Sequence, residues 1–448
     1  MDRRLTDALE RHPAVHDWTA RRQVGRGAQI YLVGNQVENV RQIQRESYQV
    51  ELFNDHQADG EPSRGAAKVP VSRADLERLP DVLETATTMA SLVNNPPWSL
   101  PEPHDLPEVE LADDSLTTVD GALAAARDAA DRIRTLAANE AANDVRLSAA
   151  ELFVTTIEEE LRNSRGLTGT SIGTHLLLEI TLLARRGGEE AEYFRQAQAR
   201  RMADLRIDET VTEGSRMARD KLRATAPQTR IGQVVMSGEA LVQMFGGNAV
   251  TDTGALLTQA SAAFAYSKIS RLEVGRPIWG DREPAGDRIT VHANARLPFG
   301  VASYRFDADG VAAEDLLVIE EGVLRARPAT QRYAQYLGVP ASGRPGTAQV
   351  TPGSIPMADL LDSDGPAYHV LAFSAPNVDE LTGDFGMEIR IGYEHGPDGV
   401  QPLTGGSVTG NLFEALADVR LSSETRVNTS YAGPLAMRFG SLQVAGRD

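Results

Sequence analysis

Residues 146–185 read RLSAAELFVTTIEEELRNSRGLTGTSIGTHLLLEITLLAR, and this stretch decides the fold class. Two runs within it alternate apolar and polar side chains, which is the period of a strand with one buried face. Between the runs lies NSRG, in which Asn163 and Gly166 suit the positive φ angles of a tight turn. Each run is longer than the usual strand of roughly 5–6 residues. The stretch therefore predicts a long antiparallel hairpin.

The residues before and just after this hairpin carry the patterns of further strands and helices. Prolines crowd residues 95–112, where they can neither continue a helix nor donate to a strand ladder. We interpret residues 1–225 as an α+β N-terminal domain that contains the long hairpin and a proline-rich loop near 95–112. Its other predicted elements are strands at 27–33, 38–44 and 46–55, and helices at 74–93, 121–138 and 208–225.

The second half of the chain carries short strand patterns separated by turns rich in glycine, proline and aspartate. Residues 226–448 therefore predict an antiparallel, β-rich C-terminal domain, and the whole chain an α+β fold. The predicted elements are a helix at 255–269 and strands at 289–295, 302–310, 316–326, 368–375, 385–396 and 435–446.

Composition limits the function. The 448 residues carry a net charge of −18, which argues against nucleic acid as the main partner. The chain has no cysteine, so disulfides, thiolate nucleophiles and cysteine metal sites are excluded. The charged N-terminal residues lack the apolar core of a signal peptide, and no apolar run is long enough to span a membrane. We therefore expect a cytoplasmic protein without membrane contact.

Common catalytic motifs do not occur. No Walker pattern is present, and GGSVTG spaces its glycines wrongly around Ser407 for a nucleophile elbow. His175 and Glu179 are four residues apart, but on a strand they would lie about 13 Å apart, too far to share a metal ion. Three other histidines fall in separate strand patterns and could converge, although nothing in their spacing demands it. They are His292, His369 and His395.

The stretch SGEALVQMFGG (237–247) predicts a short amphipathic helix. Its apolar face comprises Leu241, Met244 and Phe245, and the two closing glycines would end it. Glu239 in the first turn suits the helix dipole. Histidines at positions 238 and 243 would make the stretch the zinc helix of a metallopeptidase, but a glycine and a glutamine stand there.

Six stretches follow one another in an order that is more specific than any one of them. They are LRNSRGLTG (161–169), YRFDADGVAAEDLLVIEEGVLRA (304–326), VTPGS (350–354), LTGDFGMEIRIGYEHG (381–396), PLTGGSVTGNLFEALADV (402–419) and GPLAMRFGSLQVAG (433–446). In this order the chain resembles the TldD/PmbA family, once called modulators of DNA gyrase, and within it the PmbA branch, also called TldE. One departure is the aspartate in YRFDADGV, where many relatives have glutamate.

The resemblance implies a division of labour between two chains. TldD-type members carry His-Glu-x-x-x-His on the helix at this point, and a distant cysteine completes their zinc site. Aligning Glu239 with the motif glutamate places Gly238 and Gln243 at the histidine positions, and no cysteine exists. The resemblance therefore implies no catalytic residue and no metal on this chain. It implies a heterodimer in which a TldD-like partner holds the zinc and cleaves unfolded or leader peptides.

The same resemblance directs attention to the Thr-Gly-Asp-Phe stretch. We expect Asn377, Thr382, Gly383, Asp384 and Phe385 to line a peptide-binding region. A hairpin turn held by asparagine and aspartate side chains explains these residues equally well. A second hypothesis is a partner-independent enzyme or binding protein, with a site built from the three C-terminal histidines and acidic residues.

Overall fold

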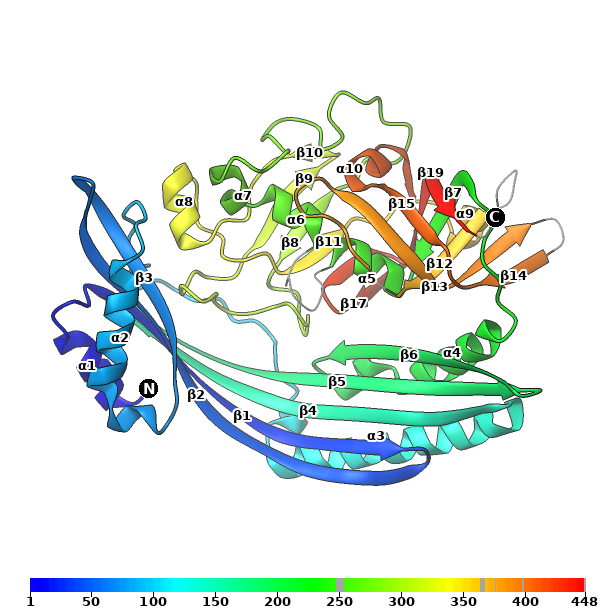
Figure 1. Ribbon diagram of the computed structural model, residues 1–448, viewed down its shortest axis with the longest axis horizontal. Helices are drawn as coiled ribbons and strands as arrows, with labels where there is room; N and C mark the ends of the chain where they lie inside the picture. The colour runs from blue at the N-terminus through cyan, green and yellow to red at the C-terminus, as the bar shows by residue number, and fades with distance from the viewer. Residues whose placement is uncertain (247–253, 363–366, 375, 397–398, 447–448) are drawn as a thin grey trace.

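The computed structural model describes residues 1–448 except 247–253, 363–366, 375, 397–398 and 447–448. Its described residues form helices and three β-sheets, which confirms the α+β class. One six-stranded sheet comes from the first half of the chain, and a six-stranded and a seven-stranded sheet come from the second half. Figure 1 shows the first sheet as a long curved layer beneath the elements of the second half.

The first sheet is antiparallel throughout, with strand order β3-β2-β1-β4-β5-β6. Its centre is the predicted hairpin, which is confirmed: β4 pairs with β5, and Gly166 in the turn has a φ of +89°. The Asn163 side-chain oxygen accepts from the backbone N–H groups of Arg165 and Leu167, each at 3.0 Å. The strands are β1 (Asp17–Val33), β2 (Gln36–Ala58), β3 (Glu61–Val71), β4 (Val145–Asn163), β5 (Thr168–Arg186) and β6 (Glu189–Ala199).

The two strands predicted at 38–44 and 46–55 are one strand, β2, so that division was wrong. Arg45, which separates the two patterns, lies opposite Gly25 in an unbroken ladder with β1. A continuous partner strand fixes the backbone even where the side-chain pattern changes.

Helices cover one face and one end of the first sheet. The predicted helix with a small-residue face is α3 (Val119–Glu140), which buries Ala122, Ala126 and Ile133 against β1 and β4. Next to it α4 (Ile207–Lys221) packs on β5 and β6. The remaining helices of this half are α1 (Arg3–Arg11), η1 (Asp75–Glu77), α2 (Leu79–Ser91), η2 (Asp114–Leu116), η3 (Ala141–Asn143) and η4 (Met202–Leu205).

The two sheets of the second half share one apolar core, to which Val234 and Val291 contribute from different sheets. Most strand pairs are antiparallel, and β12–β7 and β11–β18 are parallel. The seven-stranded sheet contains β7 (Arg230–Ser237), β12 (Ala367–Phe373), β13 (Asp384–Gly396), β14 (Gly399–Leu403), β15 (Ser407–Asn411), β16 (Val419–Leu421) and β19 (Ala436–Ala445). The six-stranded sheet contains β8 (Val291–Asn294), β9 (Asp315–Glu320), β10 (Val323–Leu324), β11 (Thr347–Val350), β17 (Thr425–Asn428) and β18 (Tyr431–Pro434).

Three predictions for the second half were wrong. Residues 316–326, predicted as one strand, form a hairpin of two antiparallel strands, because the chain turns at Gly322, which has a φ of +77°. Residues 302–310 form a turn rather than a strand, because the Asp307 carboxylate accepts from the backbone N–H groups of Asp309 and Val311, each at 2.9 Å. The single helix predicted at 255–269 is two helices, because Ser261 is extended and caps the second one. The helices of this half are α5 (Glu239–Phe245), α6 (Ala255–Ala260), α7 (Ala262–Tyr266), α8 (Gln331–Leu337), α9 (Met357–Leu361), α10 (Leu412–Ala415) and η5 (Leu416–Asp418).

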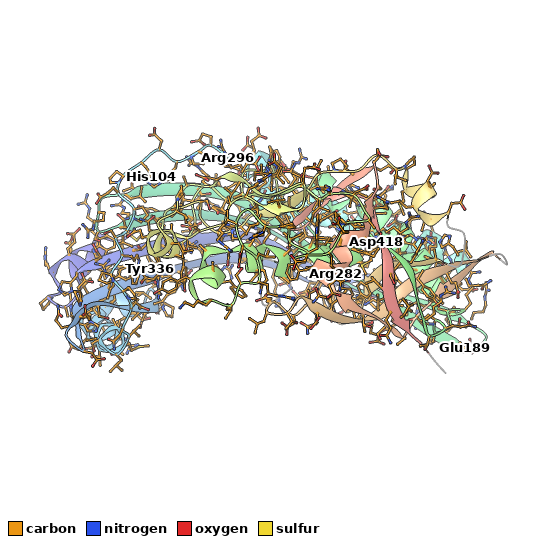
Figure 2. The ribbon with its side chains drawn as sticks, turned by 90° about the horizontal axis from the view of Figure 1, so that it is seen from above. His104, Glu189, Arg282, Arg296, Tyr336 and Asp418 are labelled. Atoms are coloured by element: carbon orange, nitrogen blue, oxygen red, sulfur yellow. The ribbon has the colours of Figure 1, made fainter. Side chains whose placement is uncertain are left out.

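The proline-rich segment 95–112 lies against both halves of the chain. The Asn163 amide donates to Pro101 O at 2.8 Å, and the Arg305 guanidinium donates to Pro107 O at 2.9 Å. Its backbone carbonyls thus find side-chain donors, which an extended proline-rich segment needs because it has no ladder of its own. Viewed from above, Tyr336 of α8 lies toward the end that holds the N-terminal helices, and Glu189 lies at the opposite end (Figure 2).

A buried arginine joins the two halves. Arg200, which follows β6, is 3 % exposed, and no carboxylate among the described residues pairs with it. Burial, together with the smaller effect of the Arg344 charge, lowers the pKa of its guanidinium to about 10. Five backbone oxygens accept from it instead: Gly300 (2.7 Å), Val301 (3.1 Å), Ser303 (2.8 Å), Thr174 (3.2 Å) and Leu111 (3.4 Å).

None of the helices in the described part of the chain is both long and apolar enough to cross a membrane.

Candidate functional site

The helix that would carry zinc in a TldD-type protein is α5, and it packs into the core. Strand β7 leads into it through Gly238. Leu241, Met244 and Phe245 are each 1 % exposed, which confirms the predicted apolar face. The helix ends at Phe245, one residue before Gly246, and the second closing glycine lies outside the described residues.

Gly238 cannot be replaced by a ligand without strain. Its φ of 60° and ψ of −124° lie in a region that only glycine adopts without strain, because a Cβ would crowd the adjoining peptide groups. A histidine here would first have to change the path of the chain between β7 and α5. The first ligand position is therefore shaped for glycine.

Gln243, at the second ligand position, is already engaged. Its amide nitrogen donates to Phe373 O at 3.1 Å, and its amide oxygen accepts from Phe373 N at 2.9 Å. The same nitrogen lies 3.1 Å from a Glu239 carboxylate oxygen. Strand β12 pairs with β7 only as far as Val370. Beyond that point the side-chain amide of Gln243 bonds to Phe373 in the way that a peptide group of a neighbouring strand would.

Glu239 lies beside basic side chains. Its side chain is 31 % exposed, and Arg390 Nη1 lies 3.8 Å from its carboxylate. Burial raises the pKa of Glu239, while Arg390 and Arg195 oppose the shift. Arg195 comes from β6 of the first sheet, so the carboxylate faces the junction of the two halves.

These residues do not fit a zinc ion. One ligand position has no side chain, and the other is an amide whose oxygen and nitrogen both have partners. Across the described residues, no group of three or more histidine, aspartate or glutamate side chains is placed to hold a metal ion. With these side chains, α5 packs in the core and holds β12 through the hydrogen bonds between Gln243 and Phe373.

The Thr-Gly-Asp-Phe stretch is a turn closed by its own hydrogen bonds. The Asp379 carboxylate accepts from the backbone N–H of Thr382 at 2.8 Å, and the Asn411 amide donates to Asp384 at 2.8 Å. Gly383 has a φ of +76°, and Phe385 is buried in the core. Thr382, Asp384 and Asn377 are exposed, so of the five predicted residues only these three can offer side chains to a ligand.

The C-terminal histidines do not form one site. His369 and His395 lie on neighbouring strands with ring centroids 5.9 Å apart, and His369 Nε2 is 2.7 Å from Ser237 Oγ. Burial lowers the pKa of His369 to about 3, helped by His395 and Arg216, so this imidazole is neutral at pH 7. His292 belongs to the other sheet, where it pairs with Asp315 at 2.8 Å.

Asp307 carries a buried carboxyl group that the sequence does not reveal. Burial, together with the smaller effect of the nearby Asp309, raises its pKa to about 7. The side chain is 4 % exposed, so it resists ionisation. No signal in FDADG indicates this burial, because the same letters occur in solvated turns.

Replacing Asp307 with asparagine is expected to stabilise the protein in mild alkali. The folded-state pKa lies above the unfolded value, so Asp307 contributes stability that is present below about pH 4 and lost as the pH rises through about 7. Asparagine keeps an oxygen for the two N–H donors without a charge. In urea titrations we expect the free energy of unfolding of Asp307→Asn to exceed that of the parent by about 1–2 kcal/mol at pH 8 and to equal it at pH 4.

Asp128→Asn is the matched control, since Asp128 is exposed on α3. If both variants changed the free energy of unfolding equally, or if Asp307→Asn did not change it at pH 8, Asp307 would not be a buried carboxyl group with a raised pKa.

Comparison with known proteins agrees with this architecture. Residues 240–446 match the family model of the PmbA/TldA metallopeptidase C-terminal domain. The metalloprotease PmbA of Escherichia coli O157:H7 is 23 % identical over 296 residues, which cover 64 % of this chain and 62 % of that protein. An uncharacterized protein of Methanocaldococcus jannaschii is 23 % identical over 192 residues, 41 % of this chain and 44 % of that one. The chain thus spans less than two thirds of these curated relatives.

Solved structures match over nearly the full length. TldE from Thermococcus kodakarensis superposes with a TM-score of 0.78 at 17 % identity, covering 99 % of both chains. A proposed modulator of a DNA gyrase from Thermotoga maritima gives the same TM-score and identity, covering 98 % of this chain and 99 % of that one. Residues 240–446 therefore belong to the PmbA/TldA metallopeptidase C-terminal domain family, and the whole chain has the fold of these solved structures.

Proposed function

We propose that this chain is a non-catalytic, TldE-like subunit of a cytoplasmic, heterodimeric zinc peptidase. In this proposal a TldD-like partner supplies the zinc and its ligands. The substrate is an unfolded peptide or the leader segment of a peptide natural product. The chain itself binds no zinc. It forms part of the wall of a peptide cavity shared with the partner and offers strand edges to the peptide.

One observation carries the proposal: the motif glutamate is retained at Glu239, while both flanking ligand positions serve the fold. Gly238 provides a backbone conformation that histidine cannot adopt without strain, and Gln243 holds both backbone groups of Phe373. A helix used in this way supports a subunit whose chemistry lies elsewhere. The full-length likeness to TldE adds support for the fold.

The exposed polar residues of the turn are the proposed peptide contacts on this chain. Asp384 begins β13, and Asn377 and Thr382 lie in the segment before it; all three residues are exposed and would contact an extended peptide, which pairs its backbone with a strand edge with little side-chain selectivity. Phe373 is excluded as a pairing point because Gln243 already occupies its N–H and C=O groups.

Zinc content and peptidase activity test the proposal. We expect the purified chain to hold far less than one zinc per molecule by elemental mass spectrometry and to leave an unstructured peptide intact. Co-expression with a TldD-like protein from the same genome is expected to give a stable complex, one zinc per pair, and cleavage.

The control is a partner whose motif glutamate is replaced by glutamine, which should still form the complex but not cleave. Stoichiometric zinc on this chain alone, or cleavage by it alone, would refute the proposal and favour a partner-independent enzyme. Because His292 lies in a different sheet from His369 and His395, no observation favours that second function now.

A further inference from the structure

The turn of residues 302–310 rests on the end of the hairpin that β4 and β5 form. Its Phe306 side chain packs in one apolar cluster with Leu161 and Leu167 of that hairpin. A Cβ atom on Gly310 would come within 2.5 Å of the Leu167 side chain, so the backbone of the turn lies directly against the first sheet. This contact joins the second half of the chain to the first.

Carboxyl groups from both halves lie close to one another at this contact. Glu51 on β2 is half-buried, and burial raises its pKa, with a smaller contribution from the charge of Asp309. Burial also raises the pKa of Asp309. The third member is the buried Asp307, whose raised pKa also depends in part on Asp309. These three residues, the junction acids, therefore hinder one another's ionisation.

The cations near the junction acids are held by other groups. The charged and titratable neighbours of the junction acids are Lys68 on β3, Arg21 on β1, Arg332 on α8, Arg344 and Tyr304. Arg21 Nε donates to Glu159 at 2.6 Å. Arg332 donates to Asn95 at 2.5 Å and lies over the Trp98 ring. In the described part of the chain, none of these cations forms an ion pair with a junction acid.

Ionisation of the junction acids therefore acts against the contact between the halves. A closed contact keeps like charges away from water and without a paired cation, whereas an open one lets water solvate them. The pKa of Asp307 is about 7 in the closed contact and about 4 in water, so its stabilising effect is complete below about pH 4 and is lost as the pH rises through about 7.

We propose that this contact is a pH-sensitive switch: in mildly alkaline solution the ionised junction acids release the turn of residues 302–310 from the first sheet. The apolar cores of both halves stay folded when the turn is released. This inference is independent of the proposed function, because it concerns one chain and needs neither zinc nor a partner.

Hydrogen–deuterium exchange of the full chain, followed by mass spectrometry, measures the release. After division by the intrinsic exchange rate, we expect peptides of the turn 302–310 to open about tenfold more at pH 8 than at pH 6. One group whose pKa falls from about 7 to about 4 on opening gives this ratio. In the triple variant Glu51→Gln/Asp307→Asn/Asp309→Asn, opening should be the same at both pH values.

The single variant Glu51→Gln tests whether the two halves act on each other. It leaves the turn unchanged and removes one charge from the opposite half, so the turn should open less at pH 8 than in the parent. A turn that opened only because of its own aspartates would not respond to this change.

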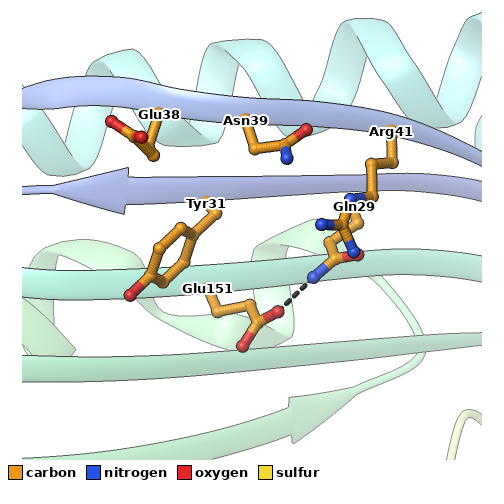
Figure 3. A pocket seen from close by; sticks show the side chains of 6 residues that line it. All are labelled: Gln29, Tyr31, Glu38, Asn39, Arg41 and Glu151. Atoms are coloured by element: carbon orange, nitrogen blue, oxygen red, sulfur yellow. Dashed lines mark hydrogen bonds between the residues drawn. The ribbon is translucent and has the colours of Figure 1, made fainter.

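A matched control removes three exposed charges away from the contact. In Glu38→Gln/Asp128→Asn/Asp359→Asn the tenfold difference should remain. Figure 3 shows Glu38 near the start of β2, at a groove that it lines with residues of β1 and β4.

Four outcomes would overturn the proposal. They are equal opening of the turn at pH 6 and pH 8 in the parent, a tenfold difference that survives in the triple variant of the junction acids, and identical exchange of Glu51→Gln and the parent at pH 8. The fourth is an equal rise at pH 8 in peptides of α3, which would mean that the whole chain unfolds rather than the contact.

Discussion

Replacing Arg200 with alanine is expected to lower the free energy of unfolding by about 4 kcal/mol. The guanidinium donates to five backbone oxygens that belong to β5, the proline-rich segment and the loop after residue 299. Hydrogen bonds to a charged group are worth about 1.5–3 kcal/mol each, and the desolvation of the arginine offsets part of the sum. Alanine removes all five of these hydrogen bonds, and of the five oxygens Leu111 O and Gly300 O keep backbone donors, the N–H groups of Thr174 and Ser303. Urea unfolding followed by fluorescence measures the difference.

The adjacent Arg201 provides a matched control. Its side chain is 45 % exposed, pairs with Asp204 at 2.7 Å and lies over the Phe299 ring. Arg201→Ala is expected to cost less than about 1 kcal/mol, as exposed ion pairs do. Arg200→Lys keeps the charge but has only one side-chain nitrogen, so its loss of unfolding free energy should lie between those of Arg200→Ala and Arg201→Ala. Equal effects at both positions would show that Arg200 does not join the halves of the chain.

The sequence predicted best those elements whose pattern and partner lie close together. The hairpin of β4 and β5 follows from local alternation and from Asn163 and Gly166 in its turn. The division of β2 failed because its partner β1 overrides a local change of pattern at Arg45. Residues 302–310 read as a strand, yet a single carboxylate, that of Asp307, folds them into a turn.

The candidate site shows the same limit. The apolar face of α5 was predictable from the spacing of Leu241, Met244 and Phe245. The role of Gln243 was not, because Phe373 lies 130 residues further along the chain. Arg200 gave no signal at all, since its acceptors are backbone groups of any residue type. Long-range hydrogen bonds to the backbone leave no trace in the pattern of side chains.

Placing histidines at positions 238 and 243 is expected to destabilise the fold without creating a zinc site. The double variant Gly238→His/Gln243→His should lower the free energy of unfolding by about 3 kcal/mol. Part of this loss is backbone strain at a φ of 60°, and part is the loss of two hydrogen bonds that leaves Phe373 N–H and C=O without partners. The chain has no cysteine to complete the site. Urea unfolding and elemental mass spectrometry after gel filtration measure both effects.

Single variants separate the two causes. Gly238→Ala reports the strain alone, and Gln243→Leu reports the loss of the Phe373 pairing while keeping an apolar helix face. If their costs add up to that of the double variant, α5 is a packing helix whose polar groups serve β12. One zinc retained per double-variant chain, together with recovery of stability on adding zinc, would instead mean that the helix keeps the geometry of a metal site. In that case the natural chain would lack zinc only because glycine and glutamine occupy positions 238 and 243, and not because of the backbone geometry of α5.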